Sequence, residues 1–303
     1  MNHLIIGVGS EAQEMKHCVF LTTDNLDGFV TDDDLLVEPL AGLSWKVHYI
    51  PWRRRDVDWN SFEAVVIRTP WDYQKDPESF LTVLEQIETS SAHLENSLDL
   101  VRWNIHKTYL RDLESRGIEI VPTLFTRGFN HERFIELCKE IDSREIIVKP
   151  VVSASADGTF RISQNADEPA LMKVEAELHD RHVMVQPFMS GIVEEGEFSL
   201  FYFGGRYSHA ILKTPKENDF RVQEEHGGII TSVIPEAELL SSADRVQSAI
   251  SPVPLYTRID FVRTDRNTFA VMEVELIEPA LYFRMDPESP WRFAKAFDER
   301  MKG

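Results

Sequence analysis

Two glutamates near the C-terminus have the spacing expected of a site that binds a cation. Residues 256–262 and 269–277 are rich in β-branched and aromatic residues and are separated by the polar turn RTDRN, so they predict a β-hairpin. Glu273 and Glu275 then lie on one face of the second strand, because side chains alternate along a strand.

The first strand of this hairpin adds Asp260 to the same face, with Arg258 two residues before it. Neighbouring carboxylates repel each other, so Asp260, Glu273 and Glu275 are expected to form a stable cluster only if a cation joins them. Hard oxygen ligands with open positions suit Mg²⁺ that carries substrate phosphates. The solvated outer face of an amphipathic hairpin would give the same pattern, and this window alone does not separate the two interpretations.

A lysine at a strand end is a second candidate for binding a charged ligand. Lys149 ends the apolar run IIVK and precedes the loop 153–158, SASADG, which contains Ser155. Lysine can meet a phosphate as a point charge, and backbone N–H groups of such a loop can approach an anion. In isolation, the pattern favours a surface hairpin with one exposed lysine.

The segment VQPFM, residues 185–189, could hold a flat base. Backbone groups near Gln186 could hydrogen-bond the base while Phe188 packs beside it, although an interior strand is the commoner meaning of such a run. Glu197 begins the next strand and could receive ribose hydroxyls, but solvated glutamates are far commoner.

Lys213 and Arg221 lie eight residues apart, ahead of the tight turn Gly227–Gly228. Arginine can grip a phosphate or carboxylate through its planar fork, and a glycine turn lets a substrate reach the backbone near Gly228. A basic loop on an acidic surface is the alternative. The sequence contains no Ser/His/Asp triad, HExxH helix or CxxC pair that would support a hydrolase or a zinc site.

The strand end at Arg68 and Asp72 is a candidate substrate site, since ligands of open α/β sheets bind at strand ends. Arg68 would grip a substrate carboxylate while Asp72 or Glu278 holds an ammonium group. The alternative is a packed aromatic turn in which Arg68 and Asp72 pair with each other.

These residues require an α/β scaffold, with an α+β part, to position them. Strands and helices alternate at the start of the chain, which predicts a small parallel sheet. Residues 1–17 are interpreted as an extension, and residues 102–117 as one amphipathic helix. The other predicted strands are 18–24, 46–52, 64–69, 120–125, 144–149, 182–190 and the hairpin after 197, and the other helices are 32–42, 77–90, 130–142, 167–179 and 289–302.

Length and composition limit the classes of protein to which this chain can belong. The 303 residues are enough for two or three lobes, with boundaries expected near residues 104 and 187. With 51 acidic against 32 basic residues, the net charge of -19 argues against a general binder of nucleic acid or anionic membranes. Two cysteines, no membrane-length apolar run and no signal peptide indicate a cytoplasmic protein.

Taken in order, the motifs between roughly residues 105 and 285 resemble those of the ATP-grasp carboxylate–amine ligases. Asp260, followed thirteen residues on by Glu-x-Glu, resembles the family's magnesium site. DFR and GG are similar to the prokaryotic glutathione synthetase branch. VIRTPWDY, VRWNIHKTYL and ELIEPALY resemble more closely a subgroup of the cycloserine-biosynthesis type.

The resemblance implies a role for each candidate residue. Asp260, Glu273 and Glu275 would hold the metals, and Arg258, Arg221 and Lys213 would act at the reacting groups. The implied nucleotide-binding residues are Lys107, Lys149, Ser155, Gln186, Phe188, Glu197 and Lys213. The implied substrate residues are Arg68, Asp72, Arg221, Gly228 and Glu278.

The resemblance also implies an ATP-grasp fold in three parts and a reaction. The parts would be an N-terminal α/β domain (1–104), a central subdomain with a lid (105–187) and a C-terminal metal-binding subdomain (188–303). The reaction would be ATP-dependent C–N ligation through an acyl phosphate, on an amino acid or small derivative. ATP and two Mg²⁺ ions, with Mn²⁺ as a substitute, would be the cofactors.

The expected partners are a small carboxylate and an amine, without nucleic acid or membrane, in a homodimer or homotetramer. Two alternatives stay open at this point. One is a small-molecule kinase on the same scaffold, and the other is a non-catalytic nucleotide-binding protein.

Overall fold

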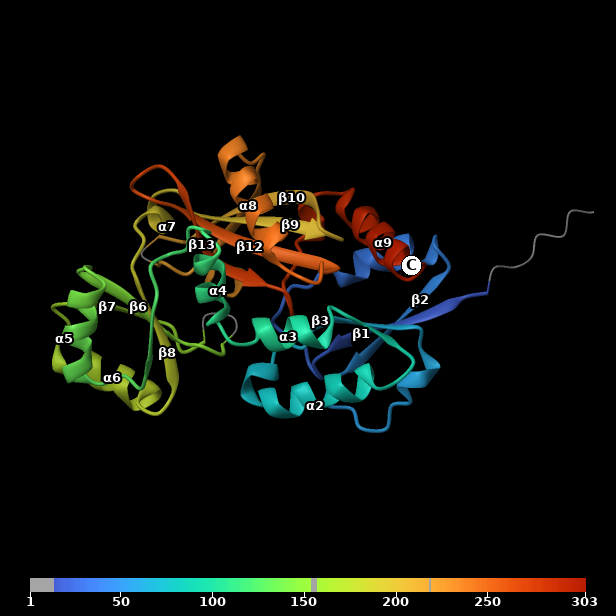
Figure 1. Ribbon diagram of the computed structural model, residues 1–303, viewed down its shortest axis with the longest axis horizontal. Helices are drawn as coiled ribbons and strands as arrows, with labels where there is room; N and C mark the ends of the chain where they lie inside the picture. The colour runs from blue at the N-terminus through green and yellow to red at the C-terminus, as the bar shows by residue number, and fades with distance from the viewer. Residues whose placement is uncertain (1–13, 154–156, 218) are drawn as a thin grey trace, which may run out of the picture.

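The computed structural model describes residues 14–153, 157–217 and 219–303. Three sheets organise three lobes, shown in Figure 1 as an N-terminal lobe in blue and cyan, a central lobe in green and a C-terminal lobe in yellow to orange. Most of the predicted extension 1–17, and Ser155, lie outside the described residues, and the first strand already begins at Lys16. None of the helices in the described part of the chain is long and apolar enough to cross a membrane.

The N-terminal lobe contains the parallel sheet that the sequence predicts. Its strands are β1 (Lys16–Thr22), β2 (Trp45–Pro51), β3 (Ala64–Thr69) and β4 (His93–Glu95), in the spatial order β2-β1-β3-β4. Every residue of β3 is buried, because helices cover both faces of a parallel sheet. Phe20 packs in a cluster with α1 (Val37–Ala41) and the C-terminal α9 (Ser289–Arg300), whereas Leu21 packs in a cluster with α2 (Pro77–Glu88).

The central lobe is a four-stranded antiparallel sheet with helices on one face. The strands are β5 (Leu124–Arg127), β6 (Glu145–Pro150), β7 (Phe160–Ser163) and β8 (His182–Pro187), and the helices are α5 (His131–Glu140) and α6 (Glu168–Leu178). In β6, Ile146 and Val148 are buried in the cluster that contains both helices. The alternate residues Ile147 and Lys149 therefore point from the opposite face, away from the helices.

The C-terminal lobe is a five-stranded antiparallel sheet in the order β11-β10-β9-β12-β13. Its strands are β9 (Glu197–Phe203), β10 (Arg206–Thr214), β11 (Ile229–Ser232), β12 (Tyr256–Arg263) and β13 (Phe269–Glu275), and α7 (Gly191–Glu194) precedes them. One face packs against α8 (Ala237–Ala249) and α4 (Tyr109–Ser115). The predicted hairpin is β12–β13, and its second strand lies at the edge of the sheet.

The structure differs from the prediction at residues 102–117, which form two helices, α3 (Leu98–Asn104) and α4, instead of one. The turn between them brings the Lys107 N–H to 2.9 Å from the carbonyl of Val151, beside the central sheet. The Asn104 side chain bonds the backbone of the edge strand β13. These tertiary hydrogen bonds outweigh the helical periodicity of the segment.

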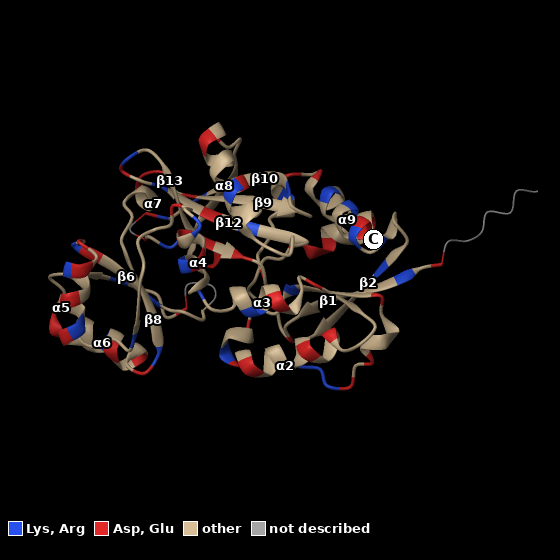
Figure 2. Ribbon diagram, in the orientation of Figure 1, with Lys and Arg blue, Asp and Glu red and all other residues tan. Residues whose placement is uncertain are grey.

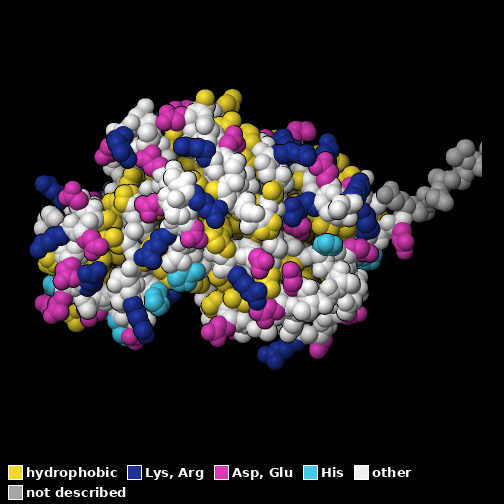
Figure 3. Space-filling view, viewed as in Figure 1, with side chains coloured by type: hydrophobic (Ala, Val, Ile, Leu, Met, Phe, Trp, Pro, Cys, Tyr) yellow, Lys and Arg dark blue, Asp and Glu magenta, His cyan; other side chains and the backbone are white. Residues whose placement is uncertain are grey.

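Acidic and basic residues are mixed along the chain in each lobe rather than forming one run of like charge. Figure 2 shows acidic and basic residues interspersed over all three lobes. The space-filling view in Figure 3 is hollowed between the central and N-terminal lobes. The main cavity lies between the central and C-terminal lobes, and the N-terminal lobe contributes a few residues to its lining.

Candidate active site

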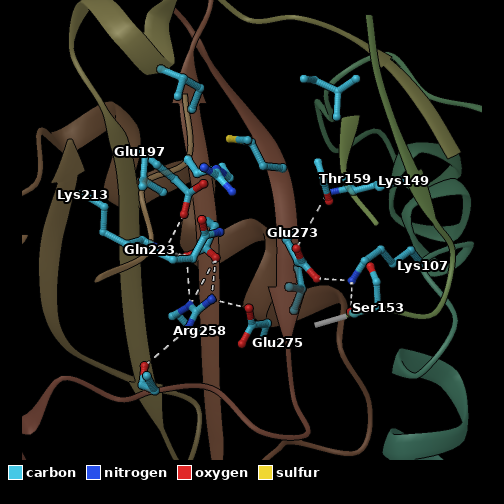
Figure 4. Close-up of a pocket in the computed structure, with 18 of the residues that line it drawn as sticks. Lys107, Lys149, Ser153, Thr159, Glu197, Lys213, Gln223, Arg258, Glu273 and Glu275 are labelled. Atoms are coloured by element: carbon cyan, nitrogen blue, oxygen red, sulfur yellow. Dashed lines mark hydrogen bonds and ion pairs between the residues drawn. The ribbon is translucent and has the colours of Figure 1, made fainter. Parts of the chain in front are cut away.

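A cavity of about 200 Å³ lies between the central sheet and the C-terminal sheet. Strands β6 and β8 contribute to one wall, and β9, β10, β12 and β13 contribute to the other. The loop after β3 adds Trp71 and Tyr73 from the N-terminal lobe. Figure 4 shows charged side chains from the central and C-terminal sheets converging on one space.

Most of the residues predicted from the sequence line this cavity. They are Lys107, Lys149, Gln186, Phe188, Glu197, Lys213, Arg221, Arg258, Asp260, Glu273, Glu275 and Glu278. Within the described part of the chain, the predicted residues that are not in its lining are Arg68, Asp72 and Gly228.

The two strands of the hairpin bring their charged residues face to face. Arg258 lies directly opposite Glu275, and Asp260 lies opposite Glu273. The Arg258 guanidinium donates to Asp260, with Nη2 2.9 Å from Oδ2, and also to Glu275. The carboxylates therefore share one face of the sheet, as the alternation of side chains predicts.

Three lysines reach the carboxylates from three different elements. Lys107 Nζ lies 2.5 Å from Glu273 Oε1, and Lys149 Nζ lies 3.9 Å from Oε2 of the same residue. Lys213, on β10, pairs with Glu197 and lies 3.5 Å from Asp260 Oδ1. Figure 4 labels Lys107, Lys149 and Lys213 and marks contacts between the residues drawn with dashed lines.

Ion pairing holds two of the three hairpin carboxylates in the charged form. Burial alone would raise the pKa of Asp260, but Arg258 and Lys213 lower it to about 2. Burial of Glu273 is likewise outweighed by Lys107 and Lys149, so its pKa is lowered. Burial raises the pKa of Glu275 to about 7, because Arg258 offsets the burial only in part.

The sequence predicts that the carboxylate cluster is stable only with a joining cation, and the structure shows side-chain cations in that role. Within residues 14–153, 157–217 and 219–303, no three His, Cys, Asp or Glu side chains gather closely enough to hold a metal ion. The physical reason is that Asp260, Glu273 and Glu275 are each turned toward a lysine or arginine. Each of the three carboxylates therefore has a side-chain cation as its partner, and metal binding at this cluster stays a prediction.

The end of the cavity near β8 is lined by both aromatic and polar side chains. Gln186 Nε2 donates to Thr123 Oγ1 at 2.9 Å. The Arg161 guanidinium lies 3.5 Å from the centroid of the Phe188 ring, a cation–π contact that no pattern in the sequence predicts. The Phe188 N–H already donates to the carbonyl of Glu145 at 2.8 Å, so this amide is not free for a base.

The residues predicted at the end of β3 belong to the scaffold instead. Arg68 is 1% exposed and pairs with Asp33, with Nη2 2.7 Å from Oδ1. Asp72 accepts hydrogen bonds from Trp52 Nε1 at 2.7 Å and from Arg53 Nε at 3.0 Å. Both predicted arrangements are therefore corrected: Arg68 does not reach the cavity, and Arg68 and Asp72 do not pair with each other.

The loop before β11 contains two of the predicted residues, Arg221 and Gly228. Arg221 lines the cavity, whereas Gly228 determines the conformation of the loop. The Arg221 guanidinium is engaged with Asp219, with Nη2 2.9 Å from Oδ2. At Gly228, a Cβ atom would lie 1.9 Å from the carbonyl oxygen of Val222. A glycine is required there because the loop closes on its own backbone.

Comparison with known proteins gives matches over both halves of the chain. Residues 18–96 match the model of the N-terminal domain of D-cycloserine synthetase DcsG, and residues 118–279 match that of the prokaryotic glutathione synthetase ATP-grasp domain. The cycloserine biosynthesis protein DcsG of Streptomyces lavendulae is 32% identical over 266 residues, which cover 83% of this chain and 87% of that protein.

Two solved structures illustrate the likeness in three dimensions. The crystal structure of D-cycloserine synthetase DcsG matches with a TM-score of 0.80 and 25% identity, over 94% of this chain and 99% of the other. The D-alanine–D-alanine ligase from Bacillus anthracis matches with a TM-score of 0.66 and 13% identity, over 95% and 97% of the two chains. The second match shows the fold alone.

Proposed function

From the premise that this chain belongs to the ATP-grasp ligases, with the prokaryotic glutathione synthetase type of ATP-grasp domain, we propose that it joins a small carboxylate to an amine through an acyl phosphate. ATP would be converted to ADP, and phosphate would leave when the amine attacks. The observation that carries this proposal is the convergence of Lys107, Lys149 and Lys213 on the carboxylates of β12 and β13.

The charged residues would act by positioning and by neutralising charge, which is most of what phosphoryl transfer requires of a protein. Lys107, Lys149 and Lys213 would meet the phosphates. Arg258 is 8% exposed and held by two carboxylates, so its guanidinium is well oriented to steady the acyl phosphate. Arg221 would also bind the acyl phosphate, once its guanidinium has released the carboxylate of Asp219.

The carboxylates suit Mg²⁺, which ATP-grasp enzymes use with ATP. The donors offered by Asp260, Glu273 and Glu275 are all oxygens, and Asp260 faces Glu273 on neighbouring strands. Bound magnesium would supply positive charge to the phosphates during transfer. We propose that these three residues hold two ions and that Mn²⁺ can substitute.

The nucleotide base would lie at the end of the cavity opposite Glu278, between the two sheets. Ile147 and Phe188 from the central lobe and Met272 from β13 line this part of the cavity and offer apolar contact. Gln186 and Glu197 would supply polar contacts to the base and the ribose. Glu197 is 7% exposed and already paired with Lys213, which would orient it.

We propose that the chain is divided at residues 104 and 187 into an N-terminal domain, a central subdomain and a C-terminal subdomain. The three separate sheets support this division. Helix α4 belongs to the central part by sequence but packs on the C-terminal sheet, so the first boundary would lie in a well-packed region.

The test is ADP release from Mg-ATP in the presence of candidate small carboxylates and amines. We expect release to require the carboxylate, and phosphate release to require the amine as well. Lys149→Met should raise the Michaelis constant for ATP by at least about tenfold, because a buried charge at the phosphates is lost. The control Lys46→Met removes an exposed lysine of β2 and should change nothing.

Accumulation of a phosphorylated small molecule that no amine consumes would instead indicate a kinase. Failure to bind Mg-ATP would indicate a nucleotide-independent protein, and either result would contradict the proposal.

A further inference from the structure

The segment after β13 forms one wall of the cavity, and hydrogen bonds from other elements hold it in place. Residues 278–282 have no regular secondary structure, yet four successive carbonyl oxygens accept hydrogen bonds from side chains. The donors are Trp71 Nε1 to Glu278 at 2.9 Å, Arg68 Nη2 to Pro279 and Arg258 Nη1 to Ala280 at 3.5 Å each, and His209 Nε2 to Leu281 at 3.0 Å. Below, residues 278–282 are called the cavity strap.

These donors come from two lobes, so the cavity strap is held in a defined conformation. The next residue along, Tyr282, has φ of 46°, a left-handed conformation that is costly for a bulky residue and persists only where the surroundings fix it. Glu278, Ala280 and Tyr282 line the cavity. The Glu278 carboxylate is therefore presented to a ligand from a rigid support.

In its partners, Glu278 differs from the other carboxylates of the cavity that are shielded from solvent. Of the six other carboxylates in the lining, five lie within 4.0 Å of a lysine or arginine (Glu197, Glu224, Asp260, Glu273 and Glu275), and the sixth, Glu225, is exposed to solvent. Among the described residues, no lysine or arginine lies within that distance of Glu278. The Tyr73 hydroxyl, which also lines the cavity, interacts with the Glu278 carboxyl and opposes the rise of its pKa.

A buried carboxylate without a counter-charge is costly, and a bound cation removes that cost. Burial and the neighbouring Glu275 raise the pKa of Glu278 to about 8, which reflects the missing counter-charge. The cavity as a whole is short of positive charge, because seven carboxylates and five lysine or arginine side chains line it. The rings of Trp71 and Tyr282 also line it, and aromatic rings favour a cation.

We propose that Glu278, with the Tyr73 hydroxyl, is the receptor for a protonated amino group of the substrate whose carboxylate is activated. The inference rests on the proposed function. Glu278 follows Glu275 by three residues, so the two are at most about 10 Å apart along the chain. A molecule that spans the reacting end and Glu278 is therefore small, such as an α- or β-amino acid or a short derivative.

The receptor also assigns the roles of the two nitrogen centres in the reaction. An amino group bound to Glu278 is held as ammonium and has no lone pair with which to attack. The nucleophilic amine must therefore be another group, either on a second molecule or further along the same one.

The test uses hydroxylamine as a general acceptor, since it traps an acyl phosphate as a hydroxamate whatever the natural amine is. The probes are glycine, β-alanine and both enantiomers of alanine and serine, each compared with the acid that lacks its amino group. We expect hydroxamate from at least one amino acid, and a kcat/KM at least about 30-fold lower for its deaminated partner.

Variants separate recognition from general damage. Glu278→Gln should raise the KM for the amino acid at least about 30-fold, remove the preference over the deaminated acid and leave the KM for ATP unchanged. Tyr73→Phe should act in the same direction by a smaller factor. The control Glu288→Gln removes an exposed carboxylate ten residues along the chain, outside the cavity lining, and should leave all constants unchanged.

The possible outcomes decide between the proposals. Equal use of amino acids and deaminated acids by the wild type, or an equal rise of both Michaelis constants in Glu278→Gln, would overturn the receptor. If no amino acid of the panel yields hydroxamate while Mg-ADP still raises the melting temperature, the receptor for small amino acids is also overturned, and nucleotide binding stands. If Mg-ADP has no effect and no product forms, the proposed function itself fails.

Discussion

Glu273, which we propose to bind metal, also has side-chain cations as partners within the protein. Its carboxylate pairs with Lys107 and Lys149, which it holds in the cavity. We expect Glu273→Gln to abolish Mg²⁺-dependent turnover. We also expect it to lower the free energy of unfolding without ligands by roughly 1–3 kcal/mol, because two lysines are left without their partner.

Urea unfolding in EDTA and turnover at saturating Mg-ATP measure the two effects. The control Glu136→Gln breaks an exposed pair with Arg133 and should change the free energy of unfolding by less than about 0.5 kcal/mol. A Glu273→Gln protein that is more stable than the wild type would show that the carboxylates repel each other more than the lysines attract them.

His209 predicts how stability depends on pH. It is 5% exposed, stacks on Phe201 with ring centroids 4.3 Å apart, and donates from Nε2 to the carbonyl of Leu281. Nδ1 then accepts from Ser208, so the ring is neutral. Burial lowers the pKa of His209 to about 4.

The unfolded state binds this proton near pH 6.5 and the folded state only near pH 4, so stability is lost as the pH falls between the two values. The loss attributable to His209 is roughly 3 kcal/mol at most. Urea unfolding at pH 7, 5.5 and 4.5 should show a smaller loss in His209→Gln than in the wild type, whereas the exposed-site control His93→Gln should follow the wild type. Parallel curves for His209→Gln and the wild type would contradict the assignment.

At the residue scale, the sequence predicts groups brought together by short-range geometry and misses long-range partners. The face shared by Arg258, Asp260 and Glu273 follows from strand alternation and a short turn, so it could be read directly. The Arg68 partner, Asp33, lies 35 residues away, and the carbonyl of Pro279 lies 211 residues away. No local pattern in the sequence encodes such pairs. The sequence therefore predicts Arg68 at the substrate, whereas in the structure Arg68 supports the cavity strap.

At the scale of elements, the turn between α3 and α4 is what places Lys107 beside Glu273. Strand β13 lies at the sheet edge and has backbone groups that no strand pairs. Asn104 satisfies two of them, donating to the carbonyl of Val274 at 2.8 Å and accepting from the N–H of Leu276 at 2.9 Å. The side chain thus covers the edge and ends α3.

Asn104→Ala should leave both backbone groups without partners and lower the free energy of unfolding by roughly 2–3 kcal/mol. It should also raise the KM for ATP, because Lys107 follows three residues later. Urea unfolding and steady-state kinetics measure these effects, with Asn165→Ala, an exposed side chain before α6, as the control. Loss of stability without any change in the KM for ATP would mean that Lys107 is positioned independently of the turn.

Regular elements with one buried face were predictable, and elements defined by tertiary contacts were not. The parallel strands β1, β2 and β3 and helix α2 lie close to the predicted ranges, since their hydrophobic patterns match their burial. Helix α8 was not predicted, although its buried Leu239, Ala243 and Val246 recur at helical spacing. The break after Asn104 gave no signal, because it depends on the edge of β13.

At the scale of the whole molecule, residues from all three lobes line the cavity, and each lobe is built on its own sheet. Lys149 comes from the central lobe, Asp260 and Glu273 from the C-terminal lobe, and Tyr73 from the N-terminal lobe. A ligand that contacts all three walls binds the folded arrangement and not the unfolded chain. Its binding free energy therefore adds to the stability of the lobes together.

Mg-ADP should consequently stabilise the central and C-terminal lobes as one unit. At a concentration about 100 times its dissociation constant, the expected gain is roughly 2.7 kcal/mol. Hydrogen exchange should slow for amides of both β6 and β12, since the nucleotide would bridge their side chains. ADP with EDTA should give a smaller gain, because the metal ion that we propose Asp260 and Glu273 to hold would be removed. Lys149→Met should reduce the protection of β6 and β12 together, since a bridge broken at one wall releases both. Slower exchange in one lobe alone would show that the nucleotide binds to a single sheet and that the lobes unfold independently of each other.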